Sequence, residues 1–532
     1  MSLLSVENLS VTIHDTPILR DVSFAVEPGQ VVGLVGESGS GKSMTSLAVM
    51  GLLPAGARAT GRVMMGGQDL LSLSDPAMCR VRGNQIGMIF QEPMTALNPV
   101  QTIGDQVAET LVIHGAARRS DALKMARDRL DRVGLARFPL ERFPHELSGG
   151  QRQRVCIAMA VALRPRLLIA DEPTTALDVT TQAQILDLLK GLVAEEGMSL
   201  LLITHDLAVV AGVADRVAVM QSGAIVEADA TEPLFRARRH DYTRRLFAAS
   251  SHVPKRIAQA TDRPLLQVDG AVRDYTLPRS SLFGPAPKLR AVKGASFTLH
   301  EGESLGLVGE SGCGKSTLTR AILGLEPLQA GRITLDGERI VAGRVPSAVR
   351  AKVQVVFQDP YGSFNPRHRV ERLVAEPFHL APARDRRARV AEALTDVGLK
   401  PDDMDKYIHE FSGGQRQRIA IARALIIRPK LIVLDEAVSA LDVRVRAQIL
   451  DLLADLQGRM GLSYLFISHD LSVVRAITDR VMVMKAGEIV ESGETGAVFD
   501  RPRHGYTREL LAATPQIPAD WMRRSEDEGT LV

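Results

Sequence analysis

The chain has 532 residues, of which 45% are hydrophobic and 24% charged, an ordinary globular composition that is long enough for more than one domain. A formal net charge of +3, without a long basic stripe, argues against nucleic acid as a partner. No apolar run reaches the roughly 18 residues of a membrane span, and the three cysteines are too widely separated to form a four-ligand metal site. We therefore expect a protein of a reducing, cytoplasmic compartment.

The first motif along the chain is a phosphate-binding loop at residues 36–43, Gly-Glu-Ser-Gly-Ser-Gly-Lys-Ser. It follows the apolar run 31–35 and precedes a helical pattern, which is the strand-to-helix context that a P-loop requires. Its glycines let backbone amides approach a triphosphate at the start of a helix. We expect the lysine to reach the β- and γ-phosphates and the last serine to hold Mg²⁺. The ATP-binding residues predicted here are Gly36, Ser38, Gly39, Gly41, Lys42 and Ser43.

Two further patterns complete this half of the chain. Ser148-Gly149-Gly150-Gln151 opens a helix and offers a second anion-binding surface. The apolar run 167–170 predicts a buried strand that delivers Asp171 and Glu172 to the edge beside the P-loop. Phosphoryl transfer needs mainly positioning and charge stabilisation, so we expect Asp171 to bind Mg²⁺ through water and Glu172 to polarise the attacking water.

The same patterns return later in the chain. Ser412, Asp435 and His469 follow Ser148, Asp171 and His205 at a constant offset of 264 residues, and a second P-loop occupies residues 309–316. A repeated order of this length indicates duplication of whole domains. The alternation of buried-type strands and helices predicts an α/β fold with a largely parallel sheet in each copy, and a helical insertion between P-loop and Ser-Gly-Gly-Gln. We predict a first domain at 1–251, a linker at 252–264, a second domain at 265–515 and a disordered tail at 516–532.

Taken together, these motifs resemble those of the ATP-binding cassette (ABC) ATPases, in which Leu-Ser-Gly-Gly-Gln is the family signature. The resemblance covers nearly the whole chain. It implies two tandem P-loop NTPase domains, each with a RecA-like core, an antiparallel β subdomain and a helical subdomain. It also implies that the two cassettes pair within one chain, each ATP being shared by one P-loop and the other signature, so that no homodimer is required.

The resemblance assigns a role to each motif residue. Glu172 and Glu436 would be catalytic together with the switch histidines His205 and His469. Tyr275 would stack on adenine in the second copy, whereas His14 stands nearest that place in the first. Mg²⁺ would be held by Ser43, Gln91, Asp171, Ser316, Gln358 and Asp435. The remaining residues expected to bind ATP are Gln91, Ser148, Gly149, Gly150, Gln151, Gly309, Ser311, Gly312, Gly314, Lys315, Ser316, Gln358, Ser412, Gly413, Gly414 and Gln415.

A narrower resemblance, to the dipeptide/oligopeptide/nickel importers, is carried by residues 91–99 and 358–366 and by His-Asp-Tyr-Thr at 240–243 and His-Gly-Tyr-Thr at 504–507. Among these, the importers of microcin C-type peptides are the most similar. The subfamily implies an ATP- and Mg²⁺-dependent peptide-import ATPase at the cytoplasmic face of the bacterial inner membrane. Its partners would be two permease subunits, as a heterodimer, and a periplasmic solute-binding protein.

Three alternatives stay open at this point. A soluble tandem-cassette protein could act on the ribosome or DNA, but the long charged linker, zinc cysteines or coiled-coil insertion of such proteins are not visible in the sequence. The transported solute could be nickel or glutathione. One nucleotide site could be degenerate, although the acidic residues and histidines are intact in both copies, which predicts two competent sites.

Overall fold

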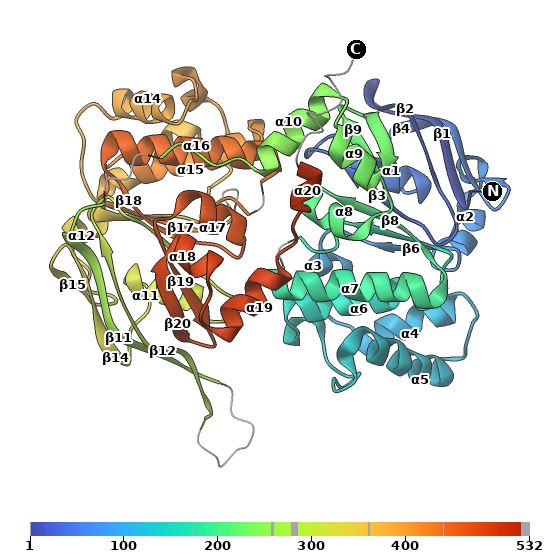
Figure 1. Cartoon of the computed structure of the whole chain (residues 1–532), viewed down its shortest axis with the longest axis horizontal. Coiled ribbons are helices and arrows are strands. Elements are labelled where there is room, and N and C mark those ends of the chain that lie inside the picture. The colour runs from blue at the N-terminus through green and yellow to red at the C-terminus, as the bar shows by residue number, and fades with distance from the viewer. Residues whose placement is uncertain are drawn as a thin grey trace. The chain divides into compact units, whose positions relative to one another are not determined.

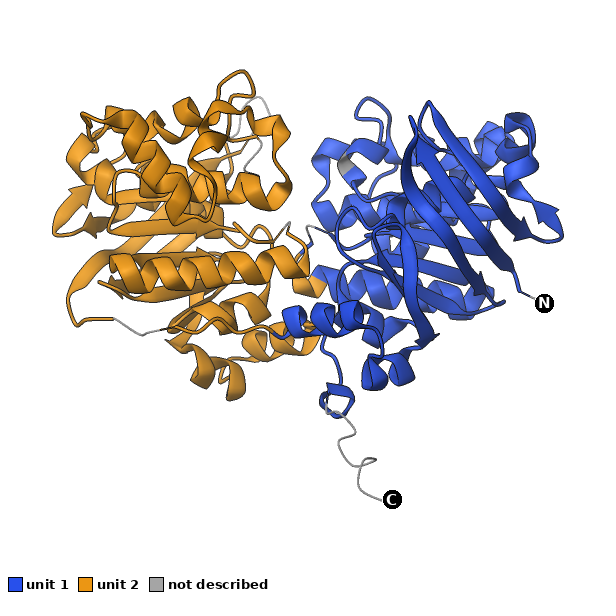
Figure 2. Ribbon diagram, turned by 90° about the horizontal axis from the view of Figure 1, so that it is seen from above, with its two compact units in different colours: residues 1–177, 181–251, 515–532 blue, residues 178–180, 252–514 orange. Residues whose placement is uncertain are grey.

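The computed structural model describes residues 2–175, 177–256, 260–277, 286–359, 362–439 and 441–522. These residues form two compact units (Figure 2). Unit 1 comprises residues 1–177, 181–251 and 515–532, and unit 2 comprises residues 178–180 and 252–514. The described part of the predicted linker is grouped with unit 2, where the Arg256 guanidinium lies 2.9 Å from the Asp479 carboxylate.

The core of unit 1 is a six-stranded sheet in the order β10-β9-β3-β8-β7-β6 (Figure 1). All neighbours are parallel except β10 and β9, and every residue of β3, β7 and β8 is buried, as expected of continuous apolar runs covered on both faces. This confirms the three strands expected before the P-loop, before Asp171 and before His205. The strands are β3 (Val31–Val35), β6 (Ile86–Ile89), β7 (Leu167–Asp171), β8 (Ser199–Thr204), β9 (Arg216–Gln221) and β10 (Ala224–Ala230).

A second sheet of unit 1 is antiparallel and follows the order β2-β1-β4-β5. One face of it packs into the same apolar cluster as β3 and helix α1 (Lys42–Val49), through residues such as Leu4, Leu9 and Val63. It is the antiparallel β subdomain that the resemblance implies. Its strands are β1 (Leu4–Ile13), β2 (Thr16–Val26), β4 (Ala57–Met65) and β5 (Gln68–Asp69).

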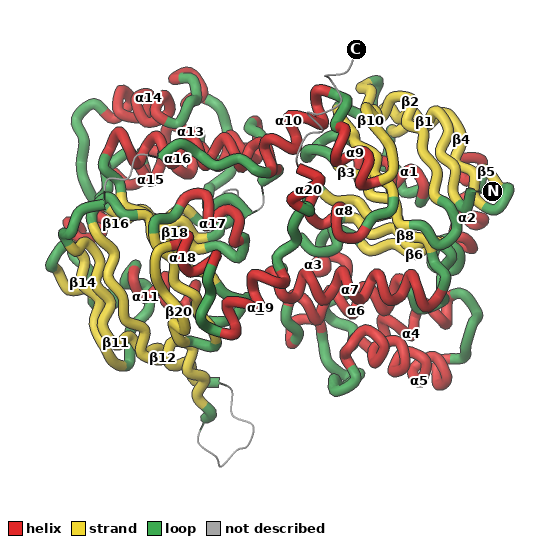
Figure 3. The backbone as a smooth tube through the Cα atoms, viewed as in Figure 1, coloured by secondary structure: helices red, strands yellow, loops and turns green. Residues whose placement is uncertain are grey.

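Helices α4, α5 and α6 of unit 1 gather at the end away from this sheet and form the expected helical subdomain (Figure 3). A π-helical turn, Asp131–Leu135, joins α5 to the segment before α6, with Gly134 in the left-handed region. The helices are α1 (Lys42–Val49), α2 (Asp75–Val81), α3 (Pro93–Ala96), α4 (Ile103–Ile113), α5 (Arg119–Leu130), α6 (Gly149–Ala160), α7 (Val179–Glu196), α8 (Leu207–Val213), α9 (Thr231–Ala237) and α10 (Asp241–Ser250), with 3-10 turns at Leu70–Ser72 and Pro144–Glu146.

Unit 2 repeats this architecture. Its core sheet has the order β16-β17-β18-β13-β19-β20, with only the β19–β20 pair antiparallel among the strands described, and its second sheet has the order β12-β11-β14-β15. The predicted duplication and the α/β class with two cassettes are therefore confirmed. The strands are β11 (Pro264–Thr276), β12 (Lys288–His300), β13 (Ser304–Val308), β14 (Ala330–Leu335), β15 (Glu338–Ile340), β16 (Val353–Val356), β17 (Leu431–Asp435), β18 (Ser463–Ile467), β19 (Arg480–Lys485) and β20 (Glu488–Glu494).

The helices of unit 2 follow the same sequence of roles. Helix α11 follows the second P-loop, α13 to α15 belong to the helical subdomain, and α19 carries the second His-x-Tyr-Thr motif. They are α11 (Lys315–Ile322), α12 (Ser347–Lys352), α13 (Val370–Val374), α14 (Arg386–Asp396), α15 (Gly413–Leu425), α16 (Val443–Met460), α17 (Leu471–Ile477), α18 (Thr495–Asp500) and α19 (Gly505–Ala513), with 3-10 turns at Glu376–His379, Pro401–Asp405 and Ile408–Glu410.

The C-terminal segment departs from the sequence-based expectation of a disordered tail beginning at residue 516. Residues 519–522 form helix α20 (Ala519–Met522), which packs on α9 within unit 1. The Trp521 ring meets Phe235 edge-on at 5.8 Å, and the Arg236 side chain donates hydrogen bonds to the carbonyl and carboxylate of Asp520. The tail is therefore anchored as far as Met522, because a few apolar residues find a tertiary partner that composition cannot reveal. Residues 523–532 lie outside the described residues.

No helix within the described ranges is both long enough and apolar enough to cross a membrane.

Candidate functional site

The P-loop of unit 1 connects β3 to α1, as the motif predicts. Gly36 follows the strand with φ 158°, and a Cβ there would lie 2.3 Å from the Met220 carbonyl oxygen, so no larger residue fits. Gly41 precedes α1 in the left-handed region with φ 103°. Lys42 is buried, and its Nζ donates to the carbonyls of Gly36 and Glu37 at 2.8 Å each. The loop is thus a compact turn that holds a cation at the N-terminus of a helix, where an anionic phosphate is favoured.

The other candidate residues of unit 1 gather beside this loop. Asp171 ends β7, and its Oδ1 accepts a hydrogen bond from the Ser43 hydroxyl at 3.2 Å. Glu172 Oε2 accepts from Gln91 Nε2 at 2.9 Å, and Glu172 Oε1 lies 3.1 Å from His205 Nδ1. Strand order explains the gathering, because β6, β7 and β8 run parallel and end at the same edge as β3.

Glu172 adopts a backbone conformation that is uncommon for a residue with a Cβ. Its φ is +47°, in the left-handed region, and its N–H donates to the Ile203 carbonyl at 2.8 Å. Glu436 repeats both features, with φ +51° and an N–H bond to the Ile467 carbonyl at 2.9 Å. Strained residues of this kind cluster at functional sites. This left-handed residue turns the chain directly after the strand. As a result, the two neighbouring acidic side chains contact different groups of the site.

The environment separates the pKa values of the two neighbouring acidic residues in unit 1. Burial raises the pKa of Asp171 to about 6, although the hydrogen bond from Ser43 opposes this shift. Burial alone would raise the pKa of Glu172, but the hydrogen bonds with His205 and Thr175 and the charge of Lys42 lower it to about 2. Glu172 is therefore ionised at neutral pH and able to accept a hydrogen bond from water.

Unit 2 places the corresponding residues in the same way. Lys315 Nζ donates to the carbonyls of Gly309 and Glu310 at 2.7 and 2.8 Å, and His469 Nδ1 lies 3.4 Å from Glu436 Oε1. Burial raises the pKa of Asp435; for Glu436 burial acts in the same direction, but the contact with His469 prevails and lowers its pKa. The remaining predicted P-loop residues, Ser311, Gly312, Gly314 and Ser316, occupy the turn and the start of α11.

The signature motifs form the N-termini of α6 and α15. In each, a serine caps the helix and the glutamine three residues later reaches back to the serine N–H, a capping box. Gly150 and its counterpart Gly414 are fixed by packing, because a Cβ there would lie 2.3 Å from Thr181 and 2.4 Å from Val445, whereas Gly413 has open space around it. Within the described part of each unit, no hydrogen bond joins the signature residues to that unit's P-loop group. The signature residues are Ser148, Gly149, Gly150 and Gln151 in unit 1, and Ser412, Gly413, Gly414 and Gln415 in unit 2.

Tyr275 lies on β11 beside the second P-loop helix. Its hydroxyl donates to Glu326 and is 3.4 Å from Thr317 Oγ1, and the Arg273 guanidinium lies 4.5 Å from its ring centroid. One ring face is thus occupied by a cation, and the ring is partly exposed. The position is compatible with an adenine platform next to α11.

Two features of the site were not identified from the sequence. The Thr175 hydroxyl donates to Glu172 Oε2 at 2.8 Å, a third hydrogen bond to that carboxylate. The tyrosines of the two His-x-Tyr-Thr motifs, Tyr242 and Tyr506, reach the P-loops through their hydroxyls. A threonine three residues after a glutamate is too common a pattern to mark a site, and the sequence indicates for the two tyrosines only a resemblance to a subfamily.

Mg²⁺ fits the donors at the P-loop. The Ser43 hydroxyl and an Asp171 carboxylate oxygen are 3.2 Å apart, and both are the hard oxygen ligands that Mg²⁺ prefers alongside phosphate oxygens.

Comparison with known proteins shows which family the chain belongs to. The family model described as ABC transporter matches residues 19–175 and 292–439, and the model described as oligopeptide/dipeptide transporter, C-terminal region, matches residues 490–531. The peptidoglycan transport ATP-binding protein YejF of Agrobacterium fabrum is 48% identical over 97% of both chains. The glutathione import ATP-binding protein GsiA of Escherichia coli is 47% identical over 97% of this chain and 90% of its own.

Among solved structures, cbiO1 from Clostridium perfringens, part of the ABC transporter complex cbiONQ, matches with 29% identity and a TM-score of 0.40, over 45% of this chain and 92% of its own. The two matched cassettes together span more than half of the sequence, and the relatives match it over almost its full length. The chain therefore belongs to the ABC transporter family, as an ATP-hydrolysing subunit with two cassettes and the C-terminal region of the oligopeptide/dipeptide transporters.

Proposed function

We propose that both cassettes hydrolyse ATP, with Glu172 and Glu436 orienting the attacking water in their respective units. The observation that carries this proposal is the Glu172 carboxylate, which is ionised and held by Gln91, His205 and Thr175 directly beside the Ser43–Asp171 pair. A fixed anionic acceptor next to a phosphate-binding loop supplies what phosphoryl transfer to water requires.

The residues divide the chemistry between them. Lys42 and Lys315 neutralise phosphate charge, and the P-loop amides hold the phosphate oxygens. Ser43 with Asp171, and Ser316 with Asp435, would hold Mg²⁺, which would supply positive charge to offset that of the phosphates. His205 and His469 orient the glutamates from the neighbouring strand. The exposed Ser148 and Ser412, at helix N-termini, offer further donors to a phosphate group.

We further propose that ATP hydrolysis energises the import of short peptides and peptide conjugates through separate permease subunits. The support is the oligopeptide/dipeptide transporter region at residues 490–531 together with relatives named for peptidoglycan and glutathione transport. The two kinds of relative are nearly equally similar, so peptides as a class, and not one peptide, are the proposed substrate. The relatives are named for transport and for import, which favours this function over one on the ribosome or DNA.

The proposed permease-docking surfaces are the segments 88–104 and 355–370, which include Gln91 and Gln358. In the first segment Phe90 is 43% exposed and Val100 78% exposed, and in the second Phe357 is 40% exposed. Apolar side chains this accessible next to a nucleotide site are typical of a protein-binding surface. Docking there would hold the chain at the cytoplasmic face of the inner membrane, with two permeases and a periplasmic solute-binding protein as partners.

The proposed import is tested by uptake in cells that lack the gene for this chain. Cells complemented with the wild-type chain should take up radiolabelled tripeptide, and cells complemented with Glu172→Gln plus Glu436→Gln should not. Cysteine cross-linking from Val100→Cys should capture a membrane permease. Recovery of ribosomes or DNA in place of membranes would contradict the import function, and uptake of nickel but no peptide would contradict the substrate class.

A further inference from the structure

The first peptide group of each P-loop is held from both sides. In unit 1 the Gly36 carbonyl accepts from Lys42 Nζ at 2.8 Å, while the N–H of the same peptide, from Glu37, donates to the Tyr242 hydroxyl at 3.1 Å. The lysine and the tyrosine therefore act on opposite ends of one planar unit. Because a peptide group moves as a rigid plane, fixing its N–H side also fixes the direction of the carbonyl that receives the lysine.

Unit 2 has the same arrangement. The Gly309 carbonyl accepts from Lys315 Nζ at 2.7 Å, and the Glu310 N–H donates to the Tyr506 hydroxyl at 3.0 Å. The two cassettes differ in much of their sequence, yet each makes the same contact between a tyrosine near the end of the cassette and its P-loop. A contact kept on both sides of the duplication is a property of the cassette and not of one local packing arrangement.

The tyrosines are well anchored on their own elements. Tyr242 and Tyr506 are 1% and 2% exposed, in the first turns of α10 and α19. Each helix is capped by the histidine two residues earlier, whose Nδ1 accepts the tyrosine N–H at 3.2 Å. The ring therefore has a defined direction before it meets the loop.

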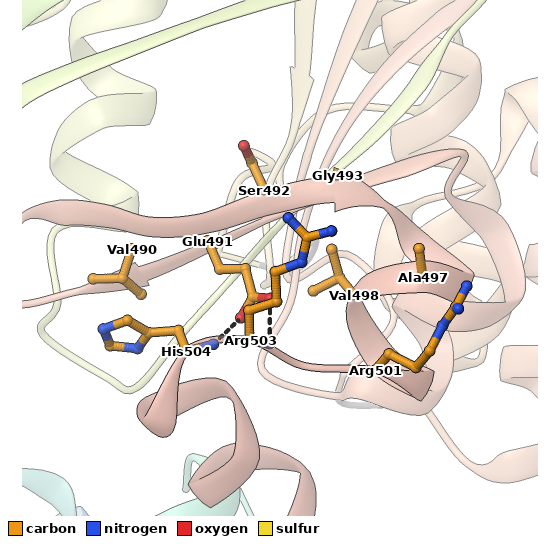
Figure 4. A pocket seen from close by; sticks show the side chains of 9 residues that line it. All are labelled: Val490, Glu491, Ser492, Gly493, Ala497, Val498, Arg501, Arg503 and His504. Atoms are coloured by element: carbon orange, nitrogen blue, oxygen red, sulfur yellow. Dashed lines mark hydrogen bonds between the residues drawn. The ribbon is translucent and has the colours of Figure 1, made fainter.

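A carboxylate on the edge strand of each core sheet, β10 or β20, holds the backbone at each histidine. In unit 2 Glu491 accepts the backbone N–H groups of Arg503 and His504 at 2.8 and 3.1 Å, beside a pocket of about 760 Å³ (Figure 4). Glu227 does the same in unit 1 for the N–H groups of Arg239 and His240, at 2.8 and 3.0 Å. A series of hydrogen bonds therefore connects an edge strand to the His-x-Tyr-Thr motif, and that motif to the P-loop.

We propose that Tyr242 and Tyr506 are positioning residues of the two ATP sites: each hydroxyl orders the first peptide of its P-loop and thereby aims the P-loop lysine. This inference rests on the proposed function of the P-loops and assigns the C-terminal transporter motif a role in nucleotide binding. A loop that is ordered before ATP arrives loses less conformational freedom on binding, so affinity rises. Removing the hydroxyl leaves a P-loop N–H without that acceptor, at a cost typical of one hydrogen bond.

The test compares Tyr242→Phe plus Tyr506→Phe with Tyr464→Phe in the full chain. Tyr464 is a matched control: it is buried, its hydroxyl donates to the Leu453 carbonyl at 2.9 Å, and it lies at the start of β18, the opposite end of the sheet from the P-loop. We expect the double variant to bind MgATP about three- to tenfold more weakly by calorimetry, with a matching rise in KM and little change in kcat. Tyr464→Phe should leave both constants at the wild-type values.

Hydrogen exchange followed by mass spectrometry separates positioning from general loss of stability. Without nucleotide, peptides covering residues 31–45 and 304–318 should exchange faster in the double variant, while the rest of each unit exchanges as in Tyr464→Phe. Unchanged affinity and unchanged exchange in these peptides would overturn the inference. If the double variant fails to fold, hydrogen exchange of the wild-type protein still tests the inference. Rapid exchange of the Glu37 and Glu310 amides in nucleotide-free protein would overturn the positioning role as well.

The outcome is distinguishable from failure of the proposed ATP sites. Lys42→Ala plus Lys315→Ala should abolish ATP binding if the P-loops act as proposed. If that variant still binds ATP, the proposed ATP sites are wrong. If it loses ATP binding while the double tyrosine variant behaves like the wild type, only the positioning role of the tyrosines is wrong.

Discussion

The two cassettes hold Glu172 and Glu436, the proposed catalytic residues, differently. In unit 1 the Glu172 carboxylate receives hydrogen bonds from Gln91 and Thr175 and contacts His205 at 3.1 Å. In unit 2 the corresponding histidine is 3.4 Å from Glu436, and among the described residues no hydrogen bond from Gln358 reaches that carboxylate. The same motif residues therefore give a densely bonded carboxylate in one unit and a more loosely held one in the other.

One substitution accounts for part of this difference. Thr175 of unit 1 corresponds to Ser439 in unit 2, and the Ser439 hydroxyl donates to the backbone carbonyl of Glu436 at 2.9 Å instead of to its carboxylate. The preceding residues also differ, Pro173-Thr174 against Ala437-Val438. The comparison shows that an intact set of motifs does not guarantee equal sites, since a hydroxyl outside the motifs decides how firmly the carboxylate is held.

The largest expected effect comes from removing the carboxylates themselves. Glu172→Gln plus Glu436→Gln should lower ATP turnover by about 100-fold or more, because an amide cannot accept a proton or orient water as a carboxylate does. Each single variant should lower the turnover measurably if both sites hydrolyse ATP. Steady-state phosphate release measures this, with ATP affinity as the control for an intact binding site. A single variant with wild-type turnover would show that its cassette binds without hydrolysing.

A smaller effect isolates the hydrogen bond that differs between the units. In a Glu436→Gln background, Thr175→Val should lower the remaining turnover about fivefold, since one hydrogen bond to a catalytic carboxylate is worth about 1 kcal/mol. The matched control is Ser439→Ala in a Glu172→Gln background, which should change turnover less than about twofold because that hydroxyl bonds only to backbone. Equal losses in the two backgrounds would mean that the observed difference has no catalytic consequence.

The C-terminal segment marks a second difference between the units. Helix α20 covers α9 in unit 1, whereas the corresponding helix of unit 2, α18, borders the 760 Å³ pocket. Trp521 is the single tryptophan of the chain, so its fluorescence reports directly on this docking. Arg236→Glu breaks the ion pair with Asp520 and should increase acrylamide quenching of that emission, with a fall in thermal midpoint of about 2 °C at most.

An ion pair of unit 2, Arg475 with Asp500 at 2.7 Å, provides the control for this experiment. Arg475→Glu removes a similarly exposed ion pair that does not touch the tail, so tryptophan quenching should stay at the wild-type level. If both variants increase quenching equally, the emission is reporting a general loosening and not the release of α20 from α9.

Features that depend on local sequence patterns could be predicted, whereas features that depend on contacts between distant residues could not. The P-loops, the strands ending in Asp171 and Asp435, and the duplication follow from local patterns, because a glycine-rich turn between strand and helix has few alternative conformations. The left-handed backbone of Glu172 and its bond to Thr175 depend on a neighbouring strand and on a turn geometry that no local pattern encodes.

For the C-terminal segment, the sequence predicted disorder where residues 519–522 form a helix. Its polar, charged composition predicted disorder, but Trp521 and Ile517 find an apolar surface on unit 1 that is distant in sequence. The same holds for Tyr242 and Tyr506, which are recognisable as motif residues although their contact with the P-loop is visible only in three dimensions. Tertiary partners, and not propensity, decided each of these cases.

The smallest expected effect concerns the one P-loop position where the two copies differ. Ser40 Oγ is buried without a hydrogen-bond partner in the described structure, whereas Cys313 at the matching position is a buried thiol whose pKa burial raises. A thiol tolerates an apolar pocket better than a hydroxyl does. Ser40→Cys should therefore raise the thermal midpoint slightly, and Cys313→Ser should lower it slightly, with turnover within about twofold of wild type in both because neither side chain is needed for phosphate contact.

Alkylation provides an independent check on the state of that thiol. Cys79 is exposed, whereas Cys156 and Cys313 are buried and burial raises the pKa of both thiols, that of Cys156 to about 12. Iodoacetamide should therefore modify Cys79 first, and mass spectrometry should find Cys313 unmodified while turnover is intact. Rapid modification of Cys313 with loss of turnover would instead mean that the second P-loop opens readily, and the two loops would then differ in dynamics as well as in sequence.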